Sequence, residues 1–172
     1  MPKTSNELLS NLRQLRRKFE IISVACTSKN VARQAAKDRR VDLLSPCLAF
    51  PCKRFFDYAE AELASKKSVA FEIDMASILS SYRFPRIRLL SSLRKEVAVA
   101  RKFDIPITIS SGASDKNLLR SPHDYVALAS LFDLPTSHAL QALSEYPLSI
   151  IERNKRKLSP NYVAPGVRIV EN

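Results

Sequence analysis

Short runs of apolar residues, rich in β-branched side chains, alternate with stretches of helical periodicity along most of this chain. The runs lie at residues 19–26, 41–45, 68–73 and 106–110, and helical patterns separate them at 29–37, 53–66 and 87–103. A strand that repeatedly precedes a helix predicts parallel strands with helices packed outside, as in a doubly wound sheet or a (β/α) barrel. Because the runs are nearly continuous rather than alternating, we expect the sheet to be buried on both faces.

Further helices are expected around this central pattern. They are a leading helix at 4–18, a brief helix at 75–79 before a break at Pro85, a helix that opens at Ser121 and Pro122, and two or three helices within 137–157, followed by a strand-like tail at 166–170. The 172 residues fit one domain. We expect a leading helix (1–18), β/α units (19–157) and a C-terminal tail (158–172).

Functional groups in parallel β/α folds usually sit at the carboxyl ends of the strands. Those ends correspond here to residues 26–29, 45–46, 72–74 and 110–113. The last of these contains Gly112, one of only two glycines in the chain. Gly112 is expected in a turn with positive φ, and the turn lacks the lysine and the spacing of a phosphate-binding P-loop.

The placement of cysteine and apolar residues limits the class of protein. No apolar run is long enough to span a membrane, and the first residues lack the apolar core of a secretory signal. Three cysteines without CxxC spacing argue against a disulfide framework or a thiolate zinc site. A reducing, cytoplasmic setting is therefore expected.

Charge is the most informative feature for function. The chain has 28 Lys and Arg against 17 Asp and Glu, a formal net charge of +11, which indicates a polyanionic partner, most plausibly nucleic acid. Residues 83–102 hold seven basic side chains and only one acidic one, and a second basic run covers 153–157. The basic residues that close the first helix suit RNA contact and the helix dipole equally well. Tyr82 and Phe84 could stack on bases, but we expect one of them in the core.

Catalytic constellations are not apparent in the sequence. His123 and His138 are the only histidines, and neither belongs to an HxH or HExxH arrangement. There is also no GxSxG nucleophile elbow. Most of the carboxylates near strand ends are expected to pair with arginine rather than with each other.

A set of stretches, in order, resembles a known family. They lie at 17–24, 32–44, 71–73, 94–96, 106–113, 120–124, 142–154 and 163–168, so that the match covers nearly everything from Arg17 onward. In these stretches the chain is similar to archaeal ribonuclease P protein component 3, the relative of the thirty-kilodalton subunit of the eukaryotic enzyme.

The resemblance implies a protein subunit of the ribonucleoprotein that removes the 5′ leader from precursor tRNA, in which the RNA is the catalyst. It implies a TIM-barrel-like α/β fold, related to the polymerase-and-histidinol-phosphatase fold but without its histidines. The implied partners are ribonuclease P RNA, protein component 2 and the other protein subunits, with precursor tRNA contacted indirectly and no membrane. No cofactor is implied for the chain itself, since magnesium would associate with the RNA.

The resemblance also suggests which residues contact RNA. On the matching positions, the expected contacts are Lys29, Arg39, Arg40, Arg86, Arg88, Arg94, Lys95, Lys116 and Arg120. Family members usually carry extra strand-helix units before the position of Phe19. With four or five strands from Phe19 onward, the barrel is expected to be incomplete or open at its N-terminal side.

Two other functions stay open at this point. One is a metal-dependent phosphoesterase on the same architecture, which would use Asp42, Glu72 and His123. The other is a scaffold that contacts protein only.

Overall fold

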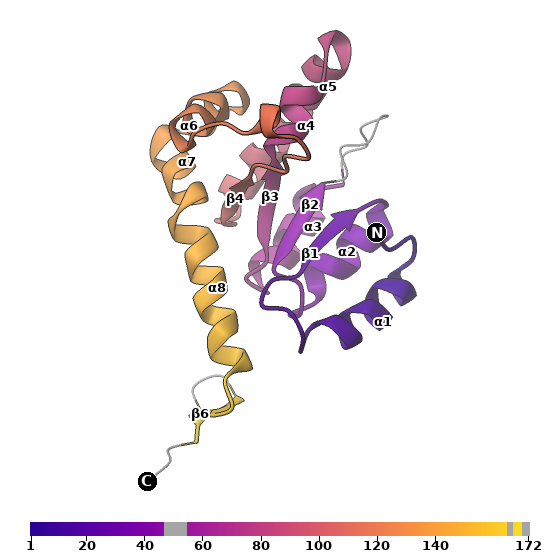
Figure 1. Cartoon of the computed structure of the whole chain (residues 1–172). Coiled ribbons are helices and arrows are strands. Elements are labelled where there is room, and N and C mark those ends of the chain that lie inside the picture. The colour runs from indigo at the N-terminus through magenta and orange to yellow at the C-terminus, as the bar shows by residue number, and fades with distance from the viewer. Residues whose placement is uncertain (47–54, 165–166, 170–172) are drawn as a thin grey trace.

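Four strands form one parallel sheet in the computed structural model, which describes residues 1–46, 55–164 and 167–169 (Figure 1). They are β1 (Ser23–Cys26), β2 (Leu43–Pro46), β3 (Ala70–Asp74) and β4 (Ile107–Ser110), in the spatial order β1-β2-β3-β4. A sequential order is that of a (β/α) barrel wall, whereas a doubly wound sheet reverses direction at a switch point. The TIM-barrel-like α/β prediction is confirmed, and the four strands form an open sheet.

Helices connect and cover the strands. They are α1 (Ser5–Leu15), α2 (Lys29–Lys37), α3 (Tyr58–Ser65), α4 (Met75–Ser80), α5 (Arg83–Lys102), α6 (Pro122–Ala129), α7 (Thr136–Leu143) and α8 (Glu145–Leu158). Two 3-10 turns, η1 (Lys116–Leu118) and η2 (Ser130–Phe132), flank α6, and β5 (Tyr162–Ala164) pairs with β6 (Val167–Arg168) as an antiparallel hairpin.

The two faces of the sheet differ in character. On one face Val24, Leu44, Phe71 and Ile107 are almost completely buried and belong to the main hydrophobic core. On the other face Glu72 is only half-buried, and its carboxylate accepts a hydrogen bond of 2.6 Å from the Ser23 hydroxyl across the intervening strand. The expectation of burial on both faces is therefore wrong, because the alternate positions of β3 carry carboxylates that need polar partners.

Helix α8 is long and extends along one side of the sheet (Figure 1). Both α7 and α8 contact the edge strand β4, and α8 then continues past the sheet toward the β5–β6 hairpin (Figure 1). Its carboxyl half thereby reaches the edge of the sheet where the strands begin, as the hydrogen bond from Arg153 to the Ser68 carbonyl, just before β3, demonstrates.

Several element boundaries differ from the sequence expectations. The first strand begins at Ser23 rather than at residue 19, and Phe19 and Ile21 are exposed. Pro85 does not break the chain but lies in the first turn of α5, where a residue without an N–H is tolerated because that donor would have no helical partner. Residues 53–54, 166 and 170, at the ends of expected elements, lie outside the described residues.

Candidate nucleic-acid interface

A pair of basic residues precedes each of the four strands, and the pair before β4 is Arg101 and Lys102. Arg16 and Arg17 end the first helical segment before β1, Arg39 and Arg40 precede β2, and Lys66 and Lys67 precede β3. Parallel strands all begin at the same edge of their sheet, so these pairs are brought to one edge although they are far apart in sequence.

The C-terminal half of α8 completes a groove at this amino edge. The groove has a volume of about 1280 Å³ and is lined by nine cationic side chains together with Ser68, Leu158, Tyr162 and Ala164. The nine cations are Arg16, Arg17, Arg39, Arg40, Lys66, Lys67, Arg153, Arg156 and Lys157. None of the described lining residues is acidic. We call this surface the basic groove.

Asp42, a fully buried carboxylate, ties together the two walls of the basic groove. One carboxylate oxygen accepts from Arg16 Nη1 at 2.5 Å and from the backbone N–H of Ile22 at 3.0 Å. The other accepts from Arg153 Nη2 at 3.1 Å and from the amide of Asn154 at 2.7 Å. One side chain thus links the end of α1, the start of the sheet and α8. It neutralises only part of the surrounding charge.

Unused hydrogen-bond donors remain at the bottom of the basic groove. Arg16 Nη2 and Arg153 Nε are buried and have no hydrogen-bond partner among the described residues. A buried guanidinium N–H without a partner costs free energy that an anion would recover. Burial, followed by repulsion from Arg153 and Arg16, holds the pKa of Lys157 below its ordinary value. The site is therefore short of negative charge.

Besides the arginines that hold the buried carboxylate, two groove cations pair with described carboxylates outside the groove lining, and Lys66 does so with Glu62 at 2.7 Å. Arg40 pairs with Asp38. Its guanidinium makes two hydrogen bonds to the Asp38 carboxylate, at 2.8 and 2.6 Å, and these bonds hold the pKa of Asp38 below its ordinary value. Arg39, beside it, is exposed and makes no ion pair with any described residue.

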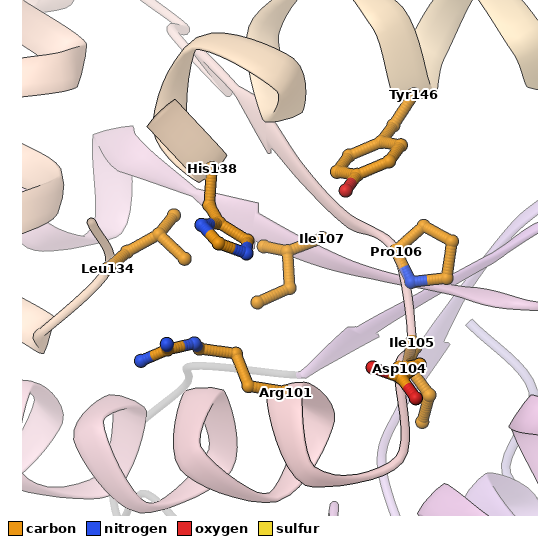
Figure 2. Close-up of a pocket in the computed structure, with 8 residues that line it drawn as sticks. All are labelled: Arg101, Asp104, Ile105, Pro106, Ile107, Leu134, His138 and Tyr146. Carbon is orange, nitrogen blue, oxygen red and sulfur yellow. The ribbon is translucent and has the colours of Figure 1, made fainter. Parts of the chain in front are cut away.

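A second, smaller cavity lies at the amino end of β4. It measures about 340 Å³ and has Ile105, Pro106, Ile107 and Leu134 as its apolar lining, with Arg101, Asp104, His138 and Tyr146 as polar lining residues. Figure 2 shows the Arg101, His138 and Tyr146 side chains directed toward the same space from α5, α7 and α8. Tyr146 donates its hydroxyl hydrogen to Gln141 at 3.2 Å, and the Nδ1 atom of His138 lies 3.4 Å from the Ser137 hydroxyl oxygen.

The nine predicted RNA contacts do not form one surface. Arg39 and Arg40 line the basic groove. Lys29 follows β1 at the opposite, carboxyl edge, where it pairs with Asp57 at 2.6 Å, and Arg94 on α5 pairs with Asp133 at 3.5 Å. The other five, also outside the groove lining, are exposed: Arg86, Arg88, Lys95, Lys116 and Arg120. Of these, Arg86 and Arg120 donate to backbone carbonyls.

The residues considered for a phosphoesterase do not come together either. Asp42 is held by arginines at the amino edge, Glu72 bonds Ser23, and His123 is exposed in the first turn of α6. Over residues 1–46, 55–164 and 167–169, no group of three or more His, Cys, Asp or Glu is placed to hold a metal ion. The same residues contain no helix with the length and apolar character needed to span a membrane.

Sequence reasoning did not select Lys66 and Lys67, or any α8 residue, as individual contacts. The sequence shows basic runs in the first helix and in α8, but the expected contacts rest on the positions that match the resembling family. The signal that was available is the repeated basic pair before each strand, which also includes Arg101 and Lys102 before β4.

Comparison with known proteins agrees with this architecture. Residues 2–159 match the model of the family described as RNase P subunit p30. Ribonuclease P protein component 3 of Methanococcoides burtonii is 33% identical over 156 residues, which are 91% of this chain and 64% of the relative. The Methanosarcina barkeri protein of the same name is 34% identical over 158 residues, covering 92% of this chain and 65% of the relative.

A solved structure is similar over almost the whole chain. It is a chain in a cryo-EM structure of archaeal ribonuclease P with mature tRNA, with a TM-score of 0.86, 26% identity, and coverage of 99% of this chain and 73% of that chain. This chain spans slightly less than two thirds of the length of the first two relatives. Because the family model matches most of its residues, the chain belongs to the ribonuclease P subunit p30 family.

Proposed function

We propose that this chain is a protein subunit of ribonuclease P that binds and stabilises the catalytic RNA through the basic groove, without catalysing cleavage itself. The observation that carries the proposal is the set of nine cations lining one groove. Family membership supplies the biological context, since relatives are named ribonuclease P components and the similar solved chain belongs to an archaeal ribonuclease P with tRNA.

The basic groove suits an RNA backbone on physical grounds. Each phosphate neutralised by Lys or Arg releases condensed counterions, which makes binding favourable and strongly dependent on salt. Surface charges usually include both signs, so a groove lined by cations alone would be unfavourable unless a polyanion occupied it. The unpartnered nitrogens of Arg16 and Arg153 are donors that phosphate oxygens would satisfy.

In the proposed assembly the chain pairs with protein component 2, joins the other subunits, and contacts precursor tRNA only indirectly. Magnesium would associate with the RNA, and the complex would act in the cytoplasm. The predicted contacts outside the groove would extend the RNA surface along α5 and toward Lys116 and Arg120.

Neutralising variants of the basic groove test the proposal. Arg39→Gln and Arg156→Gln remove exposed groove cations without breaking a described ion pair. Lys37→Gln and Lys155→Gln are matched controls, because each removes an exposed cation from the same region or helix but outside the groove lining. Binding to ribonuclease P RNA is measured over a range of salt concentrations.

We expect each groove variant to weaken RNA binding and to reduce the slope of log affinity against log salt by about one. The controls should change both quantities much less. Reconstitution with the RNA and the other proteins should then show weaker precursor-tRNA cleavage at low magnesium for the groove variants. Equal effects of groove and control variants would mean that binding follows net charge alone and would remove the basis for the proposal.

A further inference from the structure

The first two turns of α5 are unusually exposed. From Tyr82 to Arg88, all seven successive residues are exposed, although most of them are helical. Tyr82 is 76%, Phe84 75% and Ile87 63% exposed, so the expectation that one of the aromatic residues lies in the core is wrong. Figure 1 shows this end of α5 standing clear of the rest of the fold. We call residues Tyr82–Arg88 the aromatic–arginine segment.

The charge of the aromatic–arginine segment is entirely positive. Arg83, Arg86 and Arg88 form no ion pair with any residue in the described part of the chain, and the segment contains no acidic residue. The guanidinium carbon of Arg86 lies 6.0 Å from the centre of the Tyr82 ring, within reach of a cation–π contact. The segment follows β3 and α4, and so lies near the carboxyl edge of the sheet, opposite the basic groove.

We infer that the aromatic–arginine segment binds unpaired nucleobases of RNA by stacking on Tyr82 and Phe84. The inference rests on the proposed function, which supplies an RNA partner. Splayed bases stack on aromatic rings and on guanidinium planes, whereas paired bases in a duplex keep their faces covered. The segment offers both kinds of planar group, and its three arginines would neutralise the flanking phosphates.

RNA fits these features better than an acidic protein does. The basic groove and the aromatic–arginine segment lie at opposite edges of one small fold, and a single long polyanion could contact both. Base stacking also accounts for two aromatic residues that are each about three quarters exposed, which a phosphate contact alone would not require. A protein partner remains as an outcome of the test.

Variants that change the ring but keep apolar volume separate stacking from other effects. Phe84→Leu and Tyr82→Leu each remove one aromatic ring, whereas Phe84→Tyr keeps an aromatic ring at position 84. Leu148→Ala, an exposed apolar site on α8, is the matched control. The probe is a short single-stranded oligoribonucleotide, compared with the same strand annealed to its complement, and affinity is measured by fluorescence anisotropy with the full chain.

We expect each ring-removing variant to weaken single-stranded binding by roughly tenfold and to leave duplex binding unchanged, with Phe84→Tyr close to the parent protein. Equal losses for both RNA forms would assign the segment to backbone contacts and overturn the inference. No loss for either form would leave the surface to a protein partner and would also overturn it.

The failure of this inference is distinguishable from the failure of the proposed function. Arg39→Gln and Arg156→Gln in the basic groove should weaken binding of single-stranded and duplex RNA alike. If these groove variants lose affinity while the ring variants do not, the proposed function stands without base stacking.

Discussion

Replacing Asp42 by alanine tests whether one buried carboxylate holds the walls of the basic groove together. The side chain is fully buried and accepts four hydrogen bonds, from Arg16, Ile22, Arg153 and Asn154. Removing one partner from a buried ion pair typically costs about 3–5 kcal/mol, because the remaining charges lose their compensation. The side chains of Arg16 and Arg153 keep 15% and 29% of their exposure, so water can partly solvate them after the change.

The lower end of that range is therefore expected, about 3 kcal/mol. For a chain of this size each kcal/mol corresponds to roughly 2–4 °C in the unfolding midpoint, so the midpoint should fall by about 6–12 °C. Thermal and urea unfolding followed by circular dichroism measure the change. Asp42→Asn keeps the shape and two acceptor lone pairs, and should lose about half as much.

An exposed carboxylate, that of Glu62, is the control for the buried carboxylate of Asp42. Glu62 pairs with Lys66 at 2.7 Å on the exposed face of α3, and Glu62→Ala should hardly change the unfolding midpoint, because water solvates both partners of an exposed ion pair. If Asp42→Ala shifts the midpoint no more than Glu62→Ala does, the carboxylate does not fasten α1 and α8 to the sheet, and the account of the groove is wrong.

Three further changes have defined outcomes. The RNA affinity of the parent protein should fall as pH rises through the lowered pKa of Lys157, because the deprotonated amine no longer attracts phosphate. The Lys157→Arg variant should keep its RNA affinity at alkaline pH, and identical pH profiles for the variant and the parent protein would contradict this. Gly112→Ala should lower the unfolding midpoint, since Gly112 has a φ of +54° and a Cβ there would collide with the Asp74 carboxylate, which caps α4. Ser121→Ala removes the reciprocal capping box at the start of α6 and should cost about 1 kcal/mol in urea unfolding; an unchanged midpoint would mean that the cap does not stabilise the helix.

The fold was largely predictable because its signals are local. Ser121 and Pro122 open α6 as expected, and apolar runs mark all four strands of the sheet, although their ends differ by a few residues. Pro85 was misread because the same residue that breaks a helix interior is tolerated in the first turn, and the choice depends on where the preceding turn ends. The polar face of β3 was missed because Glu72 and Asp74 are only two alternate positions within a strongly apolar stretch.

The candidate site was less predictable because it is assembled from distant parts of the chain. The sequence identified clusters of charge, but only the parallel register brings Arg16, Arg39 and Lys66 to one edge. The role of Asp42 depends on Arg153, which lies 111 residues away, and no local pattern encodes such a contact. Likewise, the exposure of Phe84 follows from how far α5 projects beyond the sheet, a property of tertiary packing.

Because Arg153 and Asn154 lie 111 and 112 residues after Asp42, the ribosome synthesises them long after the carboxylate that they contact. A chain that has emerged only as far as β4 contains the basic pairs of Arg16, Arg39 and Lys66 but lacks α8, and so lacks both one wall of the groove and the arginine that shares the buried carboxylate. Arg153 is then not yet present to share the Asp42 carboxylate with Arg16. The nine cations of the basic groove are also not yet together. A nascent chain on a ribosome, which is itself rich in RNA, thus completes the basic groove only when α8 docks.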